Sequence, residues 1–136
     1  MKTLNTILLI DDDDTTNYLN HRLLSRMNVA PVIRVVTNGE EALAYLEKAQ
    51  NGVDDYPYPD LIFVDIKMYV MDGFEFLEQY KQLPESQKSK SVMLMLTSSA
   101  SFYDLEKLKA FPDVRQHVSK PLTEGDVREL VREYFQ

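Results

Sequence analysis

The chain has 136 residues, a formal net charge of −7, 44% hydrophobic residues and no cysteine. This length and composition fit a single domain, residues 1–136, with an ordinary hydrophobic core, and the lack of cysteine excludes disulfides and thiol catalysis. Acids outnumber bases and no basic block stands apart, so we expect no direct nucleic-acid binding. Since no segment resembles a signal peptide or a membrane span, the sequence predicts a cytoplasmic location.

Strand and helix patterns alternate along the whole chain. In order, they predict strand 6–10, helix 15–27, strand 32–36, a helix after Asn38, strand 61–65, helix 74–83, strand 92–96, a short helix around 105–108, strand 114–118 and a helix after Thr123. Residues 51–59 predict a loop, and the polar residues 84–91 predict a solvated connection without a chemical role.

Local signals specify the helices further. Asn38, followed three residues later by Glu41, resembles a capping box, and Thr123 is expected to cap the last helix. Helical spacing places apolar residues on the buried face of the first helix: Leu19, Leu23, Leu24 and Met27. The same spacing gives the buried face of the last helix: Val127, Leu130, Val131 and Tyr134.

The alternation predicts an α/β fold with a doubly wound, five-stranded parallel sheet. Parallel strands need crossover connections, and right-handed crossovers place helices on both faces of the sheet. The strand order 2-1-3-4-5 is then expected, with its switch point between the first and third strands. Both of these strands end in aspartate, so Asp11 and Asp65 should converge at that point.

Carboxylates are concentrated at these two strand ends. Asp65 follows an apolar run directly, and a residue in such a place can simply cap a turn. Asp13 and Asp14 are best explained by capping of the first helix, but this does not account for Asp11 and Asp12. Carboxylates within ~5 Å would repel by on the order of 3 kcal/mol for each pair. Protons or a hard cation must offset that repulsion, and oxygen ligands with open positions suit Mg²⁺.

The other two strand ends carry a hydroxyl and an ammonium. Thr97 and Ser98 follow the fourth strand, and Lys120 and Pro121 follow the fifth. Taken singly, the threonine is more often structural and the lysine an ordinary surface charge. Beside the acids they predict a phosphoryl-transfer site, with Asp65 as the nucleophile and with Thr97 and Lys120 binding the phosphoryl oxygens.

Four motifs together resemble the receiver domain of two-component response regulators. They are Ile10-Asp11-Asp12, the segment from Asp65 to Gly73, Leu96-Thr97-Ser98 and Ser119-Lys120-Pro121. The resemblance covers essentially the whole chain in the right order and spacing. It implies a flavodoxin-like fold in which Asp65 accepts a phosphoryl group from a sensor histidine kinase or a histidine phosphotransfer protein.

The same resemblance implies how the other site residues act. Asp12, Asp65 and the backbone carbonyl of Lys67 would bind Mg²⁺, with Asp11 acting through water. The Lys120–Pro121 bond would be cis, and Thr97 would be drawn inward on phosphorylation. The helix after the fourth strand, the fifth strand and the last helix would then change their binding to a downstream protein. Since no effector domain follows Gln136, we expect output through such a partner, unless the chain is a fragment.

Some positions depart from the family pattern or leave their role open. Tyr69 stands where the family usually has proline, and His117 where many members have the aromatic ring that couples to the switch threonine. His117 would make the switch pH-sensitive, or it is a strand histidine without a role. Lys67 and Ser99 occupy positions that tune dephosphorylation in the family. Three residues of the first helix could lie on the face that docks the kinase: Asn17, Tyr18 and His21.

Two alternatives remain at this point. Asp11-x-Asp13-x-Thr15 resembles the signature of haloacid-dehalogenase-type phosphatases, with Asp11 as nucleophile and Asp13 as acid and base. That interpretation leaves Asp65 and the segment 71–73 unexplained and lacks room for a cap domain. A non-phosphorylated adaptor of receiver fold is the other alternative, since fold does not fix function. The favoured hypothesis is a signalling domain that catalyses only its own phosphoryl transfer and dephosphorylation.

Overall fold

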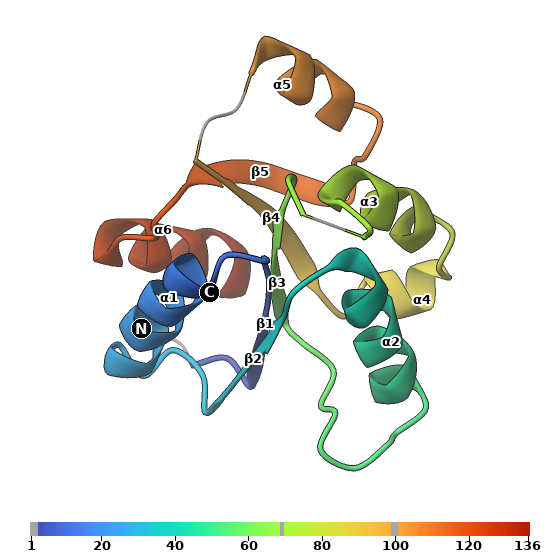
Figure 1. Cartoon of the computed structure of the whole chain (residues 1–136). Coiled ribbons are helices and arrows are strands. Elements are labelled where there is room, and N and C mark those ends of the chain that lie inside the picture. Colours follow the sequence, from blue (N-terminus) through green and yellow to red (C-terminus); the bar gives the residue numbers. More distant parts are fainter. Residues whose placement is uncertain (1–2, 69, 99–100) are drawn as a thin grey trace.

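Five parallel strands form one sheet in the order β2-β1-β3-β4-β5 (Figure 1). The computed structural model describes residues 3–68, 70–98 and 101–136. The strands are β1 (Thr6–Ile10), β2 (Val32–Val36), β3 (Leu61–Asp65), β4 (Val92–Thr97) and β5 (Val114–Ser119). All neighbouring pairs run parallel, so the structure confirms the predicted flavodoxin-like topology and the switch point between β1 and β3.

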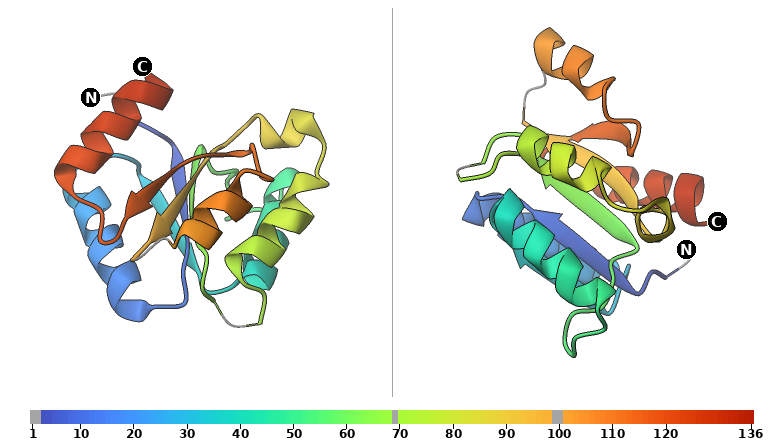
Figure 2. Two further views of the ribbon diagram at one scale, coloured as in Figure 1. Left: turned by 90° about the horizontal axis from the view of Figure 1, so that it is seen from above. Right: turned by 90° about the vertical axis from the view of Figure 1, so that its right-hand side faces the viewer.

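Helices cover both faces of this sheet (Figures 1 and 2). They are α1 (Asp14–Arg26), α2 (Gly39–Gln50), α3 (Gly73–Lys81), α4 (Glu85–Lys88), α5 (Phe102–Leu108) and α6 (Glu124–Phe135). The helices α1 and α6 lie on one face, and α2 and α3 lie on the other. The short helix α5 stands beyond β5, and none of its residues is buried. No helix within the described ranges is long and apolar enough to span a membrane.

The two central strands explain why the sheet needs two helical layers. Every residue of β1 and β3 is buried, which fits the unbroken apolar runs in their sequences. Alternate side chains of β1 enter different cores: Ile7 and Leu9 pack with α1 and α6, and Leu8 and Ile10 pack with α2 and α3. These strands therefore lie in the middle of the molecule, and their carboxyl ends are placed by packing on both sides.

The structure corrects the predicted solvated connection at residues 84–91. One helical turn, α4, forms there, and Gln87 is only 6% exposed. Lys88 of the same turn donates to Asp113, with 3.2 Å between Nζ and Oδ2. The five predicted helices thus become six within the described residues, because a single turn is too short to show helical periodicity.

The buried face of α1 was predicted only in part, since Leu23 and Leu24 are buried as expected but Leu19 is not. Leu19 is 43% exposed, and the buried residues of the helix are Asn17, Asn20, Leu23 and Leu24. The helix is rotated relative to the apolar pattern, since it buries two amide side chains that hydrogen-bond to the rest of the chain. Asn17 is therefore not part of an exposed docking face, whereas Tyr18 and His21 are exposed.

The predicted helix caps are largely confirmed. Thr123 and Asp126 form a reciprocal capping box at α6. Asn38 accepts a hydrogen bond from the backbone N–H of Glu41, as expected for the cap of α2. The Glu41 carboxylate, however, accepts from the backbone N–H of Thr37 rather than from that of Asn38, so this pair is not a complete capping box.

Gly73 holds the segment after Asp65 close to the end of β3. Its N–H donates to the carbonyl of Ile66 at 2.7 Å. A Cβ atom at this position would lie 2.3 Å from the Asp65 carbonyl oxygen and 2.7 Å from the Ile66 Cα. Both neighbours are backbone atoms that cannot rotate away, so glycine is required here for steric reasons.

Gly73→Ala should therefore lower the free energy of unfolding by about 1–3 kcal/mol, the usual cost of forcing an extra carbon into a packed site. Urea denaturation followed by circular dichroism measures this change. Gly125→Ala is the matched control, because its added Cβ would meet only the Thr123 Oγ1, at 3.8 Å. The control should be neutral or stabilising by up to about 1 kcal/mol, since alanine favours helix. Equal effects of the two substitutions would contradict the steric argument.

Candidate functional site

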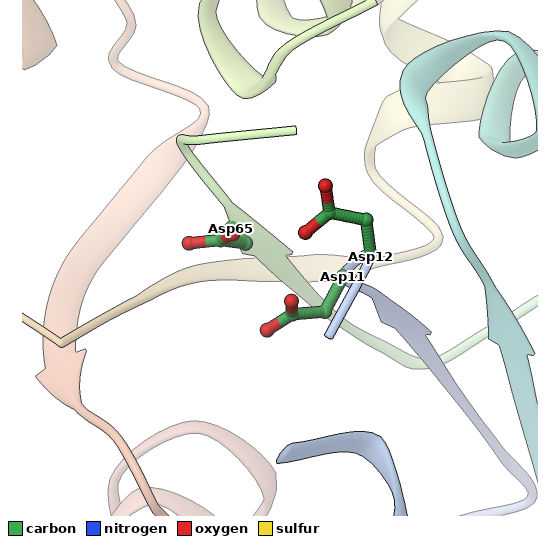
Figure 3. A group of neighbouring side chains, drawn as sticks. All are labelled: Asp11, Asp12 and Asp65. Carbon is green, nitrogen blue, oxygen red and sulfur yellow. The ribbon is translucent and has the colours of Figure 1, made fainter. Parts of the chain in front are cut away.

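Three carboxylates meet at the carboxyl ends of β1 and β3 (Figure 3). Asp11 and Asp12 follow β1 directly, and Asp65 is the last residue of β3. One oxygen from each side chain lies within 4.8 Å of the others. Asp11 and Asp65 are buried, whereas Asp12 is exposed. The pairing of β1 with β3 thus produces the convergence expected from the sequence.

Lys120 places its ammonium group between the two buried carboxylates. Its Nζ lies 2.8 Å from the Asp11 Oδ2 and 3.3 Å from the Asp65 Oδ1, and its side chain is 11% exposed. The Lys120 backbone N–H donates to the carbonyl of Thr97 at 3.0 Å, which joins the segment after β5 to the end of β4. The Lys120–Pro121 bond is cis, as predicted.

The structure brings Thr97 to the same edge of the sheet. Thr97 is the last residue of β4 and only 7% exposed, and the next residue, Ser98, is exposed. Because β4 lies beside β3 with Asp65 opposite Leu96, Thr97 lies one residue beyond the level of Asp65 on the neighbouring strand. The five side chains of Asp11, Asp12, Asp65, Thr97 and Lys120 thus come from four strand ends.

Hydrogen bonds to Asp11 hold this part of the site. Its Oδ1 accepts from the backbone N–H of Asp13 at 2.9 Å, and its Oδ2 accepts from Lys120. Its backbone carbonyl accepts from the Asn17 side chain at 2.8 Å. Asp13 itself caps α1 by accepting from the N–H of Thr16, which confirms the capping role predicted for it.

The surroundings of the two central ionisable groups, Asp65 and Lys120, raise the pKa of both. Burial, the charge of Asp11 and, more weakly, that of Asp12 raise the pKa of Asp65 from 3.8 to about 6, although Lys120 opposes them. Burial would lower the pKa of the Lys120 ammonium, but its hydrogen bonds to Asp11 and Asp65 and their charges outweigh burial, so the pKa is raised. Lys120 therefore stays charged and compensates only part of the negative cluster.

The donor set fits a hard divalent cation. Three carboxylates face a single ammonium, and all the available ligand atoms are oxygens. The elevated pKa of Asp65 shows that its negative charge is not fully compensated by the protein. An open groove at Asp12, lined also by Lys67, Met68 and Asp72, gives access from solvent. Mg²⁺ binds such partly open oxygen sites and retains several waters.

Of three residues whose role the sequence left open, His117, Tyr69 and Ser99, the structure describes only His117. His117 is exposed on β5, in register with Met95, two residues before Thr97. This position agrees with an exposed strand histidine, and its role in a switch stays a prediction. Tyr69 and Ser99 lie outside the described residues.

Sequence reasoning missed the two buried asparagines of α1 as part of the site's support. Asn17 donates to the Asp11 carbonyl, and the Asn20 Oδ1 accepts from the backbone N–H of Leu122 at 3.2 Å. Helical spacing could have indicated their burial, because Asn17 and Asn20 lie seven and four residues before Leu24 and so share its face of the helix.

The raised pKa of Asp65 has a consequence for stability. The folded protein keeps this proton up to about pH 6, whereas the unfolded chain releases it near pH 3.8, so folding stability falls as the pH rises through this window. At about pH 7, Asp65→Asn should raise the unfolding free energy of the metal-free protein by about 1–2 kcal/mol, after allowance for solvent screening.

The gain should disappear near pH 4, where the wild-type carboxyl is protonated in the folded state. Urea unfolding in EDTA at the two pH values tests this expectation. Asp12→Asn is the control, since Asp12 is exposed and its removal should change stability less. A stabilisation by Asp65→Asn that is independent of pH would contradict the electrostatic explanation.

Comparisons with known proteins agree with this geometry. The family model of the response regulator receiver domain matches residues 7–132. A two-component response regulator from Cytophaga hutchinsonii superimposes with a TM-score of 0.85 and 32% identity, over 97% of each chain. A response regulator receiver protein from Dyadobacter fermentans gives 0.80 and 27%, over 96% of this chain and 97% of the other.

A larger curated relative carries a similar segment. Hybrid signal transduction histidine kinase L of Dictyostelium discoideum is 29% identical over 136 residues. The match covers 98% of this chain but only 7% of the kinase. With the family model matched over nearly the whole length and the site residues in place, the chain belongs to the response regulator receiver domains of two-component signalling systems.

Proposed function

We propose that this chain is a single receiver domain that accepts a phosphoryl group on Asp65 and signals through phosphorylation-dependent partner binding. The observation that carries the proposal is the position of Asp65. Its carboxylate is buried at the end of β3, 3.3 Å from the Lys120 ammonium and within 4.8 Å of the Asp11 and Asp12 oxygens. A nucleophile in such a setting has positive charge beside the oxygens of an incoming phosphoryl group.

The proposed reaction transfers the group from a phosphohistidine of a sensor kinase or histidine phosphotransfer protein. An Asp65 oxygen attacks phosphorus, the phosphorus–nitrogen bond breaks, the imidazole leaves, and an acyl phosphate forms on the aspartate. Matches to a response regulator and to a segment of a hybrid histidine kinase support this donor class. Mg²⁺, when bound, would neutralise charge on the phosphoryl oxygens.

The other site residues have distinct roles in the proposal. Asp12, Asp65 and the backbone carbonyl of Lys67 would hold the metal ion, and Asp11 would act on it through water. The Lys120 ammonium and the Thr97 hydroxyl bind phosphoryl oxygens. The contacts of Lys120 support its role, because Asp11 already holds the ammonium beside Asp65.

Phosphorylation would act on the neighbouring elements through charge. It adds negative charge beside Lys120 and Thr97, which draws the hydroxyl inward and biases the face of α5, β5 and α6 between two states. A downstream protein that binds one of these states more tightly would then bind in a phosphorylation-dependent way. His117 lies on this face, exposed on β5, where a change of its ring position could follow that of Thr97.

The contacts of Asp11 argue against the phosphatase alternative. Both of its carboxylate oxygens accept hydrogen bonds, one from the N–H of Asp13 and one from Lys120, an arrangement that fits a residue that holds Lys120 in place. Asp13 caps α1 and is occupied by Thr16. We therefore assign the acceptor role to Asp65 and infer a signalling domain whose only catalysis is its own phosphorylation and dephosphorylation.

Incubation with acetyl phosphate and Mg²⁺, followed by intact mass measurement, tests this function. We expect an adduct of about 80 Da that requires Mg²⁺ and is absent in Asp65→Asn. Asp54→Asn, an exposed loop residue, should still form it. Rapid turnover that persists in Asp65→Asn and is lost in Asp11→Asn would instead establish a phosphatase. No adduct on the wild-type protein, with the fold intact, would favour the adaptor.

A further inference from the structure

Two buried asparagines of α1 contact the two segments that carry the central ion pair. Asn17 is 6% exposed and Asn20 is 2% exposed. They are three residues apart on one helix, so they share the face that packs against the sheet. Buried amides are costly unless they form hydrogen bonds, and each of these two makes one to a backbone group outside the helix, in the segment after β1 or in the segment after β5.

Asn17 holds the segment that bears Asp11. Its Nδ2 donates to the Asp11 carbonyl at 2.8 Å. A carbonyl only accepts hydrogen bonds, so the amide nitrogen, and not its oxygen, must face Asp11. Among the described residues the Asn17 Oδ1 has no partner, although it is buried. The side chain thus acts as a hydrogen-bond donor. If it only filled space, an apolar residue would be more stable here, because it would bury no unpaired oxygen.

Asn20 holds the segment that bears Lys120. Its Oδ1 accepts from the backbone N–H of Leu122, two residues after Lys120, at 3.2 Å. Leu122 is itself buried, 6% exposed. This bond fixes the chain just beyond the cis Lys120–Pro121 peptide. The lysine is therefore anchored on one side by the Thr97 carbonyl and on the other by α1.

These contacts matter because the sheet does not join β1 to β5 directly. In the order β2-β1-β3-β4-β5 two strands separate them, yet the Asp11 Oδ2 and the Lys120 Nζ lie 2.8 Å apart. Figure 1 shows α1 beside α6 on one face of the sheet. The helix is a direct connection between the two segments, independent of the intervening strands.

We propose that Asn17 and Asn20 are positioning residues that set the separation of Asp11 and Lys120. Together they keep the ammonium beside Asp65, where phosphoryl transfer would need it. The expected effect on the rate of Asp65 phosphorylation rests on the proposed function. Its geometric part, the placement of Lys120, is measurable without any phosphorylation.

The first experiment compares two substitutions at one site. Asn20→Leu removes the acceptor for the Leu122 N–H, whereas Asn20→Asp keeps it. Lysine acylation by an N-hydroxysuccinimide ester, mapped by peptide mass spectrometry, reports the accessibility of Lys120. We expect several-fold faster labelling of Lys120 in Asn20→Leu and near wild-type labelling in Asn20→Asp. Lys88, a similarly buried lysine with 12% side-chain exposure that pairs with Asp113, is the internal control and should not change.

The second readout is the rate of phosphorylation by acetyl phosphate at saturating Mg²⁺. Asn20→Leu should react about tenfold more slowly, the usual scale for loss of a supporting hydrogen bond at a site, and Asn20→Asp should stay near the wild-type rate. Thermal unfolding should rank the two variants in the opposite order, because a buried carboxylate costs more stability than the single unpaired Leu122 N–H that leucine leaves. If Asn20 had only a structural role, the less stable variant would also be the one that is phosphorylated more slowly. That result would overturn the proposal.

Asn17→Leu tests the other half of the connection. It should expose Lys120 to labelling, as Asn20→Leu does, and the double variant should show little further increase, since both act on one ion pair. Additive effects, or unchanged labelling in both single variants, would overturn the proposal. If labelling changes as expected but the wild-type protein forms no phosphoryl adduct, the proposed function fails while the positioning of Lys120 by α1 stands.

Discussion

The charge balance between Lys120 and the buried carboxylates governs the arrangement of this end of the molecule. The ammonium lies 2.8 Å from Asp11 and 3.3 Å from Asp65, in a place where neither acid is well hydrated. Breaking a buried pair leaves an uncompensated charge, which is far more costly than the pair itself is stabilising. The segments that carry these residues, after β1, in β3 and after β5, must therefore be held with little freedom, and much of the surrounding hydrogen bonding does this.

The main features of the fold and of the charge cluster could be predicted from the sequence, because both follow from strong, local patterns. The runs 6–10 and 61–65 are continuously apolar and each leads into aspartate, so parallel pairing alone brings Asp11 and Asp65 together. The caps at Asn38 and Thr123 could be located for the same reason, since a cap is a contact between residues three apart. The expected strand order was then sufficient to place Lys120 at the same edge of the sheet.

What the sequence did not predict depends on contacts between distant segments. Leu19 fits the apolar stripe of α1, yet the helix buries Asn17 and Asn20 instead, because their partners lie after β1 and after β5. Helical periodicity contains no information on such partners. The turn α4 was missed for a related reason, as Gln87 is polar and becomes buried only through tertiary packing. Polar residues that support a site are thus the hardest to recognise from one sequence.

The helix α5 buries none of its residues and presents Phe102 and Tyr103 to solvent at 79% and 70% exposure. It is held by its own capping box and by contacts at its edge, such as the Lys107 ammonium 4.5 Å from the Phe74 ring centroid. An element with so little apolar anchoring contributes little to global stability and opens at low free energy. Amide hydrogens of α5 should accordingly exchange with deuterium long before those of β1 and β3.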